Sequence, residues 1–174
     1  MGQLETIMLV CRGNTCRSVM AEVMLKRELE KVMGDAAKDI RVISAGVSAR
    51  CGDPASCQAE EAMKELGLDV SLHRARRVSA EALNDADIVL AMTESLKDEL
   101  LQDYPIIGTK VMTLTEFAGL TRELGQDIKD PFGYPLDVYK ASAAQIGRAV
   151  EIVARKIKDS FESRRDNHED RNRE

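Results

Sequence analysis

Short apolar runs alternate with longer amphipathic stretches along most of this chain. Residues 6–10 (Thr-Ile-Met-Leu-Val) form a nearly continuous apolar run, which is typical of a buried parallel strand. Further strands are predicted at residues 40–44, 87–92 and 110–114. Apolar side chains recur every three or four positions over residues 17–33, and this spacing predicts a helix with one buried face.

Three more helices are predicted, over residues 54–66, 94–101 and 137–160. Pro54 lies where a proline favours the first helical turn, and Thr93 is a typical N-cap. Strands that alternate with helices favour a parallel sheet covered on both faces. The sequence therefore predicts an α/β fold: a three-layer sandwich with a central four-stranded parallel sheet flanked by helices.

The chain is expected to form a single domain over residues 1–161. Its 174 residues are 44% hydrophobic and 32% charged, as in one ordinary globular domain. Residues 162–174 are nearly all charged or polar, so we expect a disordered tail there. Residues 119–139 contain several glycines and prolines and are predicted to form a long loop, of the kind that often carries function.

Charge and hydropathy exclude several classes of function. The net charge is −5 and there is no basic stripe, so nucleic acid and anionic membranes are not expected partners. The apolar runs are too short to span a membrane and the first residues lack a signal-peptide pattern, which favours a cytoplasmic protein. No cysteine and histidine have the spacing of zinc ligands, so no metal or other cofactor is expected. The oligomeric state stays open.

Four cysteines are present, at positions 11, 16, 51 and 57. In a cytosolic chain they are expected to be thiols. We interpret Cys51 and Cys57 as buried and chemically inert, although the Gly-Asp-Pro that follows Cys51 is typical of an exposed turn.

The loop after the first strand carries the candidate chemistry. It reads Cys11-Arg12-Gly13-Asn14-Thr15-Cys16-Arg17-Ser18. Gly13 and Asn14 favour a left-handed turn in which successive N–H groups form a nest for an anion, and the following helix adds partial positive charge. Arg17 can hold two phosphate oxygens in a bidentate fork. These positive groups favour the thiolate of Cys11, which would be a nucleophile aimed at a bound phosphorus atom.

This loop resembles the signature of the low-molecular-weight protein tyrosine phosphatase family. Residues 44–46, 73–76, 88–93 and 130–133 also resemble family segments and follow in the family's order. The resemblance covers about residues 5–160. It implies the three-layer fold, a phosphate-binding loop made by residues 12–18, and hydrolysis through a phosphocysteine intermediate.

The family resemblance implies a role for each matching residue. Cys11 would attack phosphorus, while Arg17 holds the equatorial oxygens. Asp130 would protonate the leaving atom and then activate water. Ser18 would donate a hydrogen bond to the Cys11 sulfur and stabilise it as a leaving group.

A supporting network is also implied around a strained, left-handed Asn14, which Ser44 and His73 would hold. His73 is expected to be structural rather than catalytic. Cys16 is either a redox partner that forms a reversible disulfide with Cys11 or a buried support of the loop. The charged Arg12 is unusual beside such a pocket and could favour acidic substrate surroundings.

Two features favour the protein arginine phosphatase branch of the family. Thr15 stands where the tyrosine-directed branch typically has an aliphatic residue, and Phe132 is the only aromatic directly after Asp130-Pro131. The expected partners are therefore proteins phosphorylated on arginine. Three alternatives stay open: phosphotyrosine hydrolysis, thiol-dependent arsenate reduction, and a non-catalytic phosphate-binding or redox-sensing module. Arsenate reduction would need a downstream pair of resolving cysteines, and Cys51 and Cys57 lie too early in the chain for that role.

Overall fold

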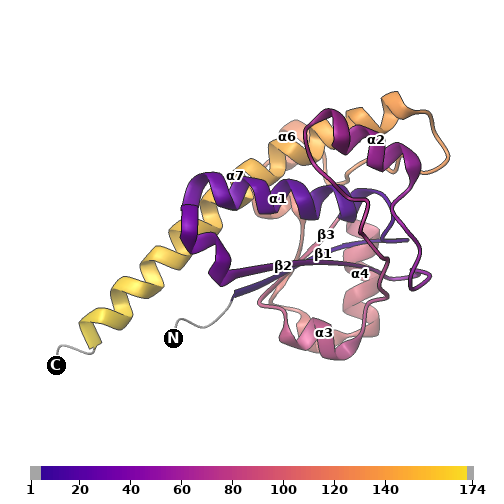
Figure 1. Cartoon of the computed structure of the whole chain (residues 1–174). Helices are drawn as coiled ribbons and strands as arrows, with labels where there is room; N and C mark the ends of the chain where they lie inside the picture. The colour runs from indigo at the N-terminus through magenta and orange to yellow at the C-terminus, as the bar shows by residue number, and fades with distance from the viewer. Residues whose placement is uncertain (1–4, 172–174) are drawn as a thin grey trace.

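A four-stranded parallel sheet forms the centre of the molecule (Figure 1). The computed structural model describes residues 5–171, with side chains through residue 164. The strands are β1 (Glu5–Cys11), β2 (Ile40–Gly46), β3 (Ile88–Ala91) and β4 (Val111–Thr113). They lie in the order β2-β1-β3-β4, and every neighbouring pair is parallel. The predicted fold class is confirmed.

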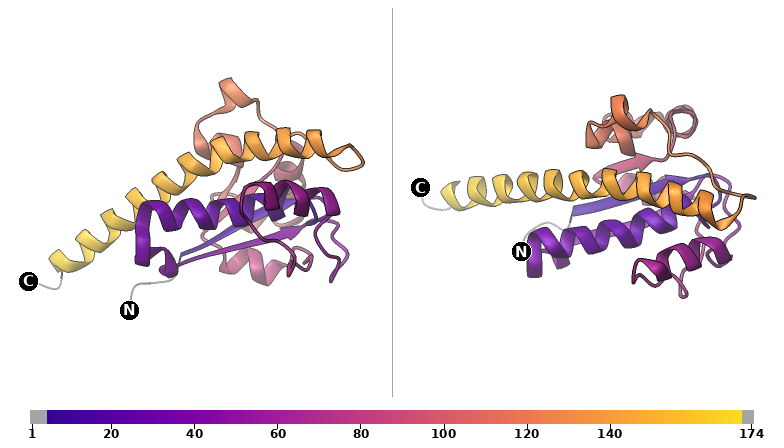
Figure 2. Two further views of the ribbon diagram at one scale, coloured as in Figure 1. Left: turned by 45° about the horizontal axis from the view of Figure 1, so that its top comes forward. Right: turned by 90° about the horizontal axis from the view of Figure 1, so that it is seen from above.

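Helices cover both faces of this sheet. They are α1 (Arg17–Met33), α2 (Cys57–Glu65), α3 (Ala80–Asp85), α4 (Glu94–Asp103), α5 (Leu114–Ala118), α6 (Thr121–Leu124) and α7 (Leu136–Arg171), with 3-10 turns η1 (Gly34–Asp39) and η2 (Pro105–Ile107). Figures 1 and 2 show α1, α2 and α7 on one side of the sheet and α3 and α4 on the other. Strand β1 is buried along its whole length, because it has a strand on each side and helices above and below.

Local signals placed some helix boundaries correctly. Helix α1 spans Arg17–Met33, as its periodicity predicts. Thr93 caps α4, since its side chain accepts a hydrogen bond from the Leu96 N–H at 3.1 Å. The predicted start of α2 at Pro54 is wrong: Ser56 is the N-cap and accepts from the Ala59 N–H.

Three short helices were not predicted. Helix α5 has a capping box between Thr113 and Glu116, a signal that the sequence contains. Helix α3 begins after Ser79, whose side chain accepts from the Ala82 N–H. Helix α6 divides the long loop expected at residues 119–139. All three have at most six residues, too few for a helical period to stand out.

The last helix continues beyond its predicted end. Disorder was expected from residue 162, whereas α7 extends to Arg171. The Arg164 guanidinium contacts the buried Glu5 carboxylate at 3.1 Å and the Ser160 hydroxyl at 3.0 Å. Such contacts attach the polar end of the helix to the start of β1, which no local pattern reveals. Residues 172–174 lie outside the described residues.

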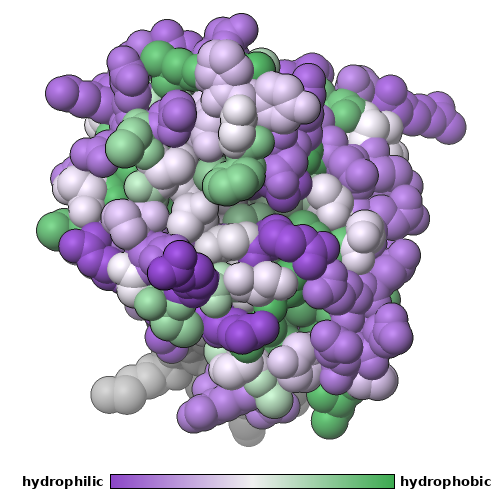
Figure 3. Space-filling model, turned by 90° about the vertical axis from the view of Figure 1, so that its right-hand side faces the viewer, coloured by the Kyte–Doolittle hydropathy of each residue, from purple (hydrophilic) through white to green (hydrophobic). Residues whose placement is uncertain are grey.

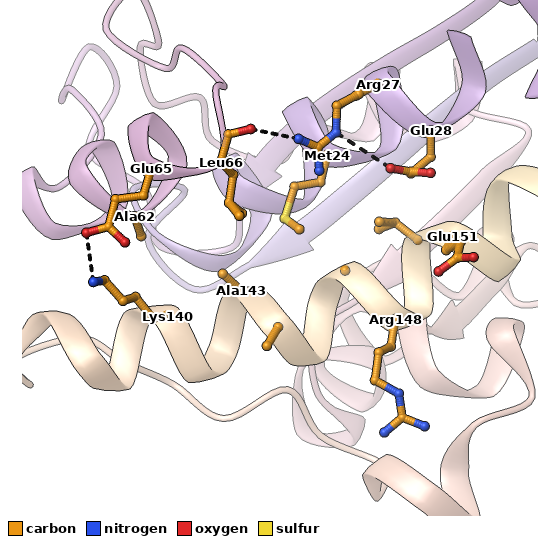
Figure 4. A pocket seen from close by; sticks show the side chains of 13 residues that line it. Met24, Arg27, Glu28, Ala62, Glu65, Leu66, Lys140, Ala143, Arg148 and Glu151 are labelled. Carbon is orange, nitrogen blue, oxygen red and sulfur yellow. Dashed lines mark hydrogen bonds and ion pairs between the residues drawn. The ribbon is translucent and has the colours of Figure 1, made fainter. Parts of the chain in front are cut away.

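A groove separates α7 from α1 and α2 (Figure 4). Its volume is about 450 Å³, and small residues line its α7 side. An ion pair of 2.7 Å between Lys140 and Glu65 joins α7 to α2 across the groove, and a 2.9 Å hydrogen bond from Arg27 to the Leu66 carbonyl joins α1 to the end of α2. Its lining contains no cysteine, serine or histidine.

Gly46, at the carboxyl end of β2, lets this strand approach the loop that follows β1. A Cβ atom there would lie 2.6 Å from the Arg12 carbonyl oxygen and 2.8 Å from the Asn14 nitrogen. Both contacts are with backbone, which cannot rotate away as a flexible side chain could. Gly46 therefore fixes the distance between β2 and the β1–α1 loop.

Replacing Gly46 with alanine should push the β1–α1 loop away from β2. We expect the free energy of unfolding to fall by about 1–3 kcal/mol, the usual cost of overpacking, together with a loss of phosphatase activity. Urea unfolding and steady-state kinetics measure the two effects. Gly108→Ala is the matched control, because its Cβ would meet only an ordinary 3.4 Å contact. Equal behaviour of the two variants would refute this role of Gly46.

Candidate active site

The Cys11 sulfur lies at the end of β1, under the loop that leads into α1. Its side chain is 3% exposed. The Asn14 N–H donates to the sulfur at 3.2 Å, and the Ser18 hydroxyl lies 2.9 Å from it. Because Ser18 Oγ accepts a hydrogen bond from the Asn14 side-chain amide, its own proton is available for the sulfur. Two donors thus converge on Cys11, and donors stabilise a thiolate.

Asn14 has a φ of 54° and is the only residue other than glycine with positive φ in the described part of the chain. Its buried amide nitrogen donates to Ser18 Oγ and Ser44 Oγ, both at 2.9 Å. Its amide oxygen accepts from the Arg76 N–H at 2.8 Å, and its carbonyl lies 2.7 Å from His73 Nε2. These bonds offset the roughly 1–3 kcal/mol cost of the left-handed backbone.

The network around Asn14 extends to α1 through a residue that the sequence did not single out. Ser44 Oγ donates to a Glu22 carboxylate oxygen at 2.5 Å, and Glu22 pairs with Lys26 at 2.6 Å. The position of Glu22 on the first helix gave no signal, because an exposed helix face commonly carries such charges.

Arg17 and Asp130 lie side by side, although 113 positions separate them. Arg17 is 4% exposed, and its Nη2 is 2.9 Å from Asp130 Oδ2. Its Nη1 donates to the Ile128 carbonyl at 3.1 Å, and Asp130 Oδ1 accepts from the Phe132 N–H at 3.2 Å. These contacts fix the orientation of the Arg17 guanidinium. The Asp130 carboxylate therefore lies next to the group that can hold a phosphate.

Several other residues predicted for the site are partly or fully exposed. Arg12 is exposed and pairs with Glu99 on α4 at 2.9 Å. Gly13 and Thr15 are half-buried. Phe132 is 71% exposed, so its ring is available to a ligand above the loop.

Cys16 contacts residues at the start of α2 and in α7 through its sulfur. Its Sγ lies 3.4 Å from Ser56 Oγ and 3.4 Å from the Tyr139 hydroxyl. Tyr139 is 2% exposed, and its burial, together with the Cys16 contact, raises its pKa from 10.0 to about 12. The phenol thus stays protonated and can donate to Cys16, which in turn donates to Ser56. Neither partner of Cys16 was identified from the sequence, since only the fold brings α2 and α7 to the loop.

All four cysteines are free thiols, and the prediction for two of them is wrong. Cys51 and Cys57 are exposed rather than buried. Cys51 precedes a turn at Gly52, which has a φ of 91°, and Cys57 is the first residue of α2. Both lie in a segment that wraps outside the sheet, where no apolar layer covers them.

The described part of the chain contains no group of three or more His, Cys, Asp or Glu side chains placed to hold a metal ion. Within residues 5–171, no helix combines the length and the apolar surface that crossing a membrane requires. The groups that the structure brings together at the loop are a thiol, a guanidinium, hydroxyls and a carboxylate.

Tyr139→Phe should remove a pH-dependent part of the stability. The raised pKa means that the folded protein keeps a proton that the unfolded chain loses, so this stabilising contribution is present below pH 10 and disappears as the pH rises toward 12. We expect the variant to lose the phenolate absorbance step near pH 12 and about 0.5–1.5 kcal/mol of stability at pH 7, the worth of a hydrogen bond. Tyr134→Phe, at an exposed residue, is the control; an unchanged step in Tyr139→Phe would contradict the assignment.

Comparisons with known proteins agree with this geometry. The family model described as low molecular weight phosphotyrosine protein phosphatase matches residues 6–163. A protein-arginine-phosphatase from Geobacillus stearothermophilus is 37% identical over 87% of this chain and 95% of its own length. Arsenate reductase 2 from Staphylococcus haemolyticus is 39% identical over 84% of this chain and 94% of its own.

A solved structure adds evidence on the nucleophile. A YwlE arginine phosphatase variant, in which serine replaces cysteine and the active-site serine is phosphorylated, superposes with a TM-score of 0.79. It is 33% identical, and the match covers 88% of this chain and 95% of that one. Together with the family match and the placement of Cys11, these similarities show that the chain belongs to the low-molecular-weight protein tyrosine phosphatase family and is a cysteine-dependent phosphatase.

Proposed function

We propose that this protein hydrolyses phosphoarginine in protein substrates through a phosphocysteine on Cys11. The observation that carries the chemistry is the pair of groups around one phosphate site: a sulfur that accepts two donors, and Arg17 bound to Asp130 at 2.9 Å. These contacts support Cys11 as the nucleophile, Arg17 as the group that holds the anion and Asp130 as the proton donor.

The proposed reaction has two steps. The Cys11 thiolate attacks phosphorus and the bond to the substrate nitrogen breaks, while Asp130 gives that nitrogen its proton. Asp130 then takes a proton from water as the water attacks phosphocysteine, so that phosphate leaves and the thiolate is restored. The loop amides and Arg17 stabilise the charge on the transferring phosphoryl group, and Ser18 stabilises the departing sulfur.

We favour phosphoarginine over phosphotyrosine as the substrate because the wall of the pocket is polar. Phosphoarginine ends in a planar, polar guanidine, which benefits from hydrogen-bonding partners more than from aliphatic contacts. Thr15 offers a hydroxyl from the half-buried loop, Asp130 a carboxylate, and Phe132 one exposed aromatic face. The similarity to a protein-arginine-phosphatase supports this choice.

Thr15→Ile should shift activity from phosphoarginine to phosphotyrosine. Loss of one hydrogen bond to the guanidine is expected to lower the ratio of the two kcat/KM values about tenfold. Steady-state kinetics on matched peptides measure this ratio. Thr15→Val, which keeps the shape and removes the hydroxyl, separates the effect of the hydroxyl from that of the shape. A ratio that stays flat in both variants would refute the role of Thr15 in substrate choice.

Asp130→Asn should lower kcat for phosphorylated peptides by about 10²–10⁴-fold, the usual contribution of a general acid. The loss should be smaller for p-nitrophenyl phosphate, whose leaving group needs less protonation. Phosphate bound to Cys11 should accumulate, and quench mass spectrometry can detect it, with Cys11→Ala as the control that has no group to phosphorylate at this position. Absence of phosphorus on the sulfur during turnover would exclude the proposed intermediate.

Arsenate reduction is the second candidate, because one similar protein is an arsenate reductase and Cys51 and Cys57 are exposed. A reductase on this scaffold would need these two thiols to resolve a product on Cys11. The double variant Cys51→Ser/Cys57→Ser separates the two functions within the same set of assays. We expect its phosphatase activity to be retained; arsenate-dependent turnover that the variant loses would favour the reductase. Cys16 stays a predicted redox partner of Cys11.

A further inference from the structure

Two surface segments hold the Cys11 loop from the side of β2. The Gly46 N–H donates to the Arg76 carbonyl at 2.9 Å, and the Arg76 N–H donates to Asn14 Oδ1 at 2.8 Å. Residues 47–48 donate to the carbonyls of Cys11 and Arg12 at 3.1 and 2.9 Å. The backbone of both segments therefore lies against the Cys11 loop.

Arginines dominate the exposed side chains of these two segments. Ala75 is 1% exposed, so the alternation of an extended chain places Arg74 and Arg76 on the side opposite to it. There both arginines border a hollow beside α1 whose lining also contains Glu22 and Asp69. Arg77 is also exposed. Backbone hydrogen bonds between residues 52–53 and Ala75, of 2.9 and 2.8 Å, bring Arg50 and its neighbours beside them.

Most of these guanidinium groups lack an acidic partner. Arg74 donates only to the carbonyl oxygens of Ser71 and His73. Among the side chains that the structure describes, no carboxylate lies within 4 Å of the Arg74, Arg76 or Arg77 guanidinium. By contrast, Arg12 is engaged by Glu99 at 2.9 Å, and Arg50 lies 3.9 Å from Asp53.

These positive side chains are grouped near one another although the chain as a whole has a net charge of −5. Figure 3 faces the end of the molecule toward which the strands point, and the most hydrophilic side chains gather around the middle of that face. An unpaired cationic group gains more from a carboxylate than one that already has a partner, and arginine can bind a carboxylate with two parallel hydrogen bonds.

We propose that Arg50, Arg74, Arg76 and Arg77, here called the arginine rim, bind acidic side chains that flank the phosphorylated residue of a protein substrate. This inference rests on the proposed phosphatase function and adds a sequence preference to it. The rim does not touch the reacting atoms. It raises the local concentration of acidic segments at the Cys11 loop, so its effect should appear in kcat/KM and weaken with salt.

The test compares three peptides with the same phosphorylated residue and with glutamate, alanine or lysine on both sides. Each set is made with phosphoarginine and with phosphotyrosine, so the outcome does not depend on which of the two is the substrate. Rates are divided by the rate with p-nitrophenyl phosphate, which has no flanking residues, so that a general loss of activity in a variant cancels.

We expect the wild-type kcat/KM to be about tenfold higher with glutamate than with alanine flanks at low salt, since exposed ion pairs contribute about 0.2–1 kcal/mol each, a factor of about 1.4–5. Arg74→Gln/Arg76→Gln should reduce this ratio to near one, and Arg50→Gln, on the other segment, should reduce it in part. Arg148→Gln is the matched control, an exposed arginine on α7 with no described carboxylate partner, and should leave the ratio unchanged.

Equal wild-type rates on the glutamate and alanine peptides would overturn the proposal, as would a ratio that survives in the rim variants. A single-stranded oligonucleotide that competes at lower concentration than the acidic peptide would also overturn it, in favour of nucleic acid. Wild-type protein that hydrolyses p-nitrophenyl phosphate but shows no flank preference refutes the rim alone. Protein that hydrolyses none of the substrates refutes the proposed function as well.

Discussion

The left-handed backbone of Asn14 is the constraint on which the site depends. Only with φ near 54° does the Asn14 N–H point at the Cys11 sulfur, at 3.2 Å. An asparagine would relax from this conformation if its polar atoms had other partners. It is held because Ser44, Ser18 and the Arg76 backbone together satisfy its buried amide. The nucleophile is thus prepared by hydrogen bonds that come from three separate parts of the chain.

The sheet holds the Cys11 loop in a fixed position. Cys11 is paired with Gly46 at the carboxyl end of β1 and β2, and the absence of a side chain on Gly46 allows the loop backbone to approach. Strand β1 is buried throughout, so the loop cannot shift without disturbing the core. The Arg76 backbone takes part in the same set of contacts, so one arrangement orders the thiol and brings exposed arginines near the loop.

A second set of contacts joins the loop to the helices that cover the sheet. Arg17 reaches the Ile128 carbonyl and Asp130, just before α7, while Cys16 contacts Ser56 at the start of α2 and Tyr139 in the first turn of α7. Catalysis requires the acid and the nucleophile to keep a fixed separation within a fraction of an ångström. The packing of α7 against the loop, to which the buried Tyr139 contributes, keeps Arg17 and Asp130 in contact, as the proposed reaction would require.

The sequence by itself determined the α/β class, the bounds of α1 and the order of the strands and the longer helices, because hydrophobic periodicity and capping residues act over a few neighbouring positions. It also indicated the loop from Cys11 to Ser18, whose chemistry is contiguous, whereas Asp130 was recognised only through family resemblance. Tertiary structure alone decided the partners of Cys16, the Glu22 contact, the exposure of Cys51 and Cys57, and the extension of α7. Each of these depends on which distant segments pack together, and a local pattern carries no information about such contacts.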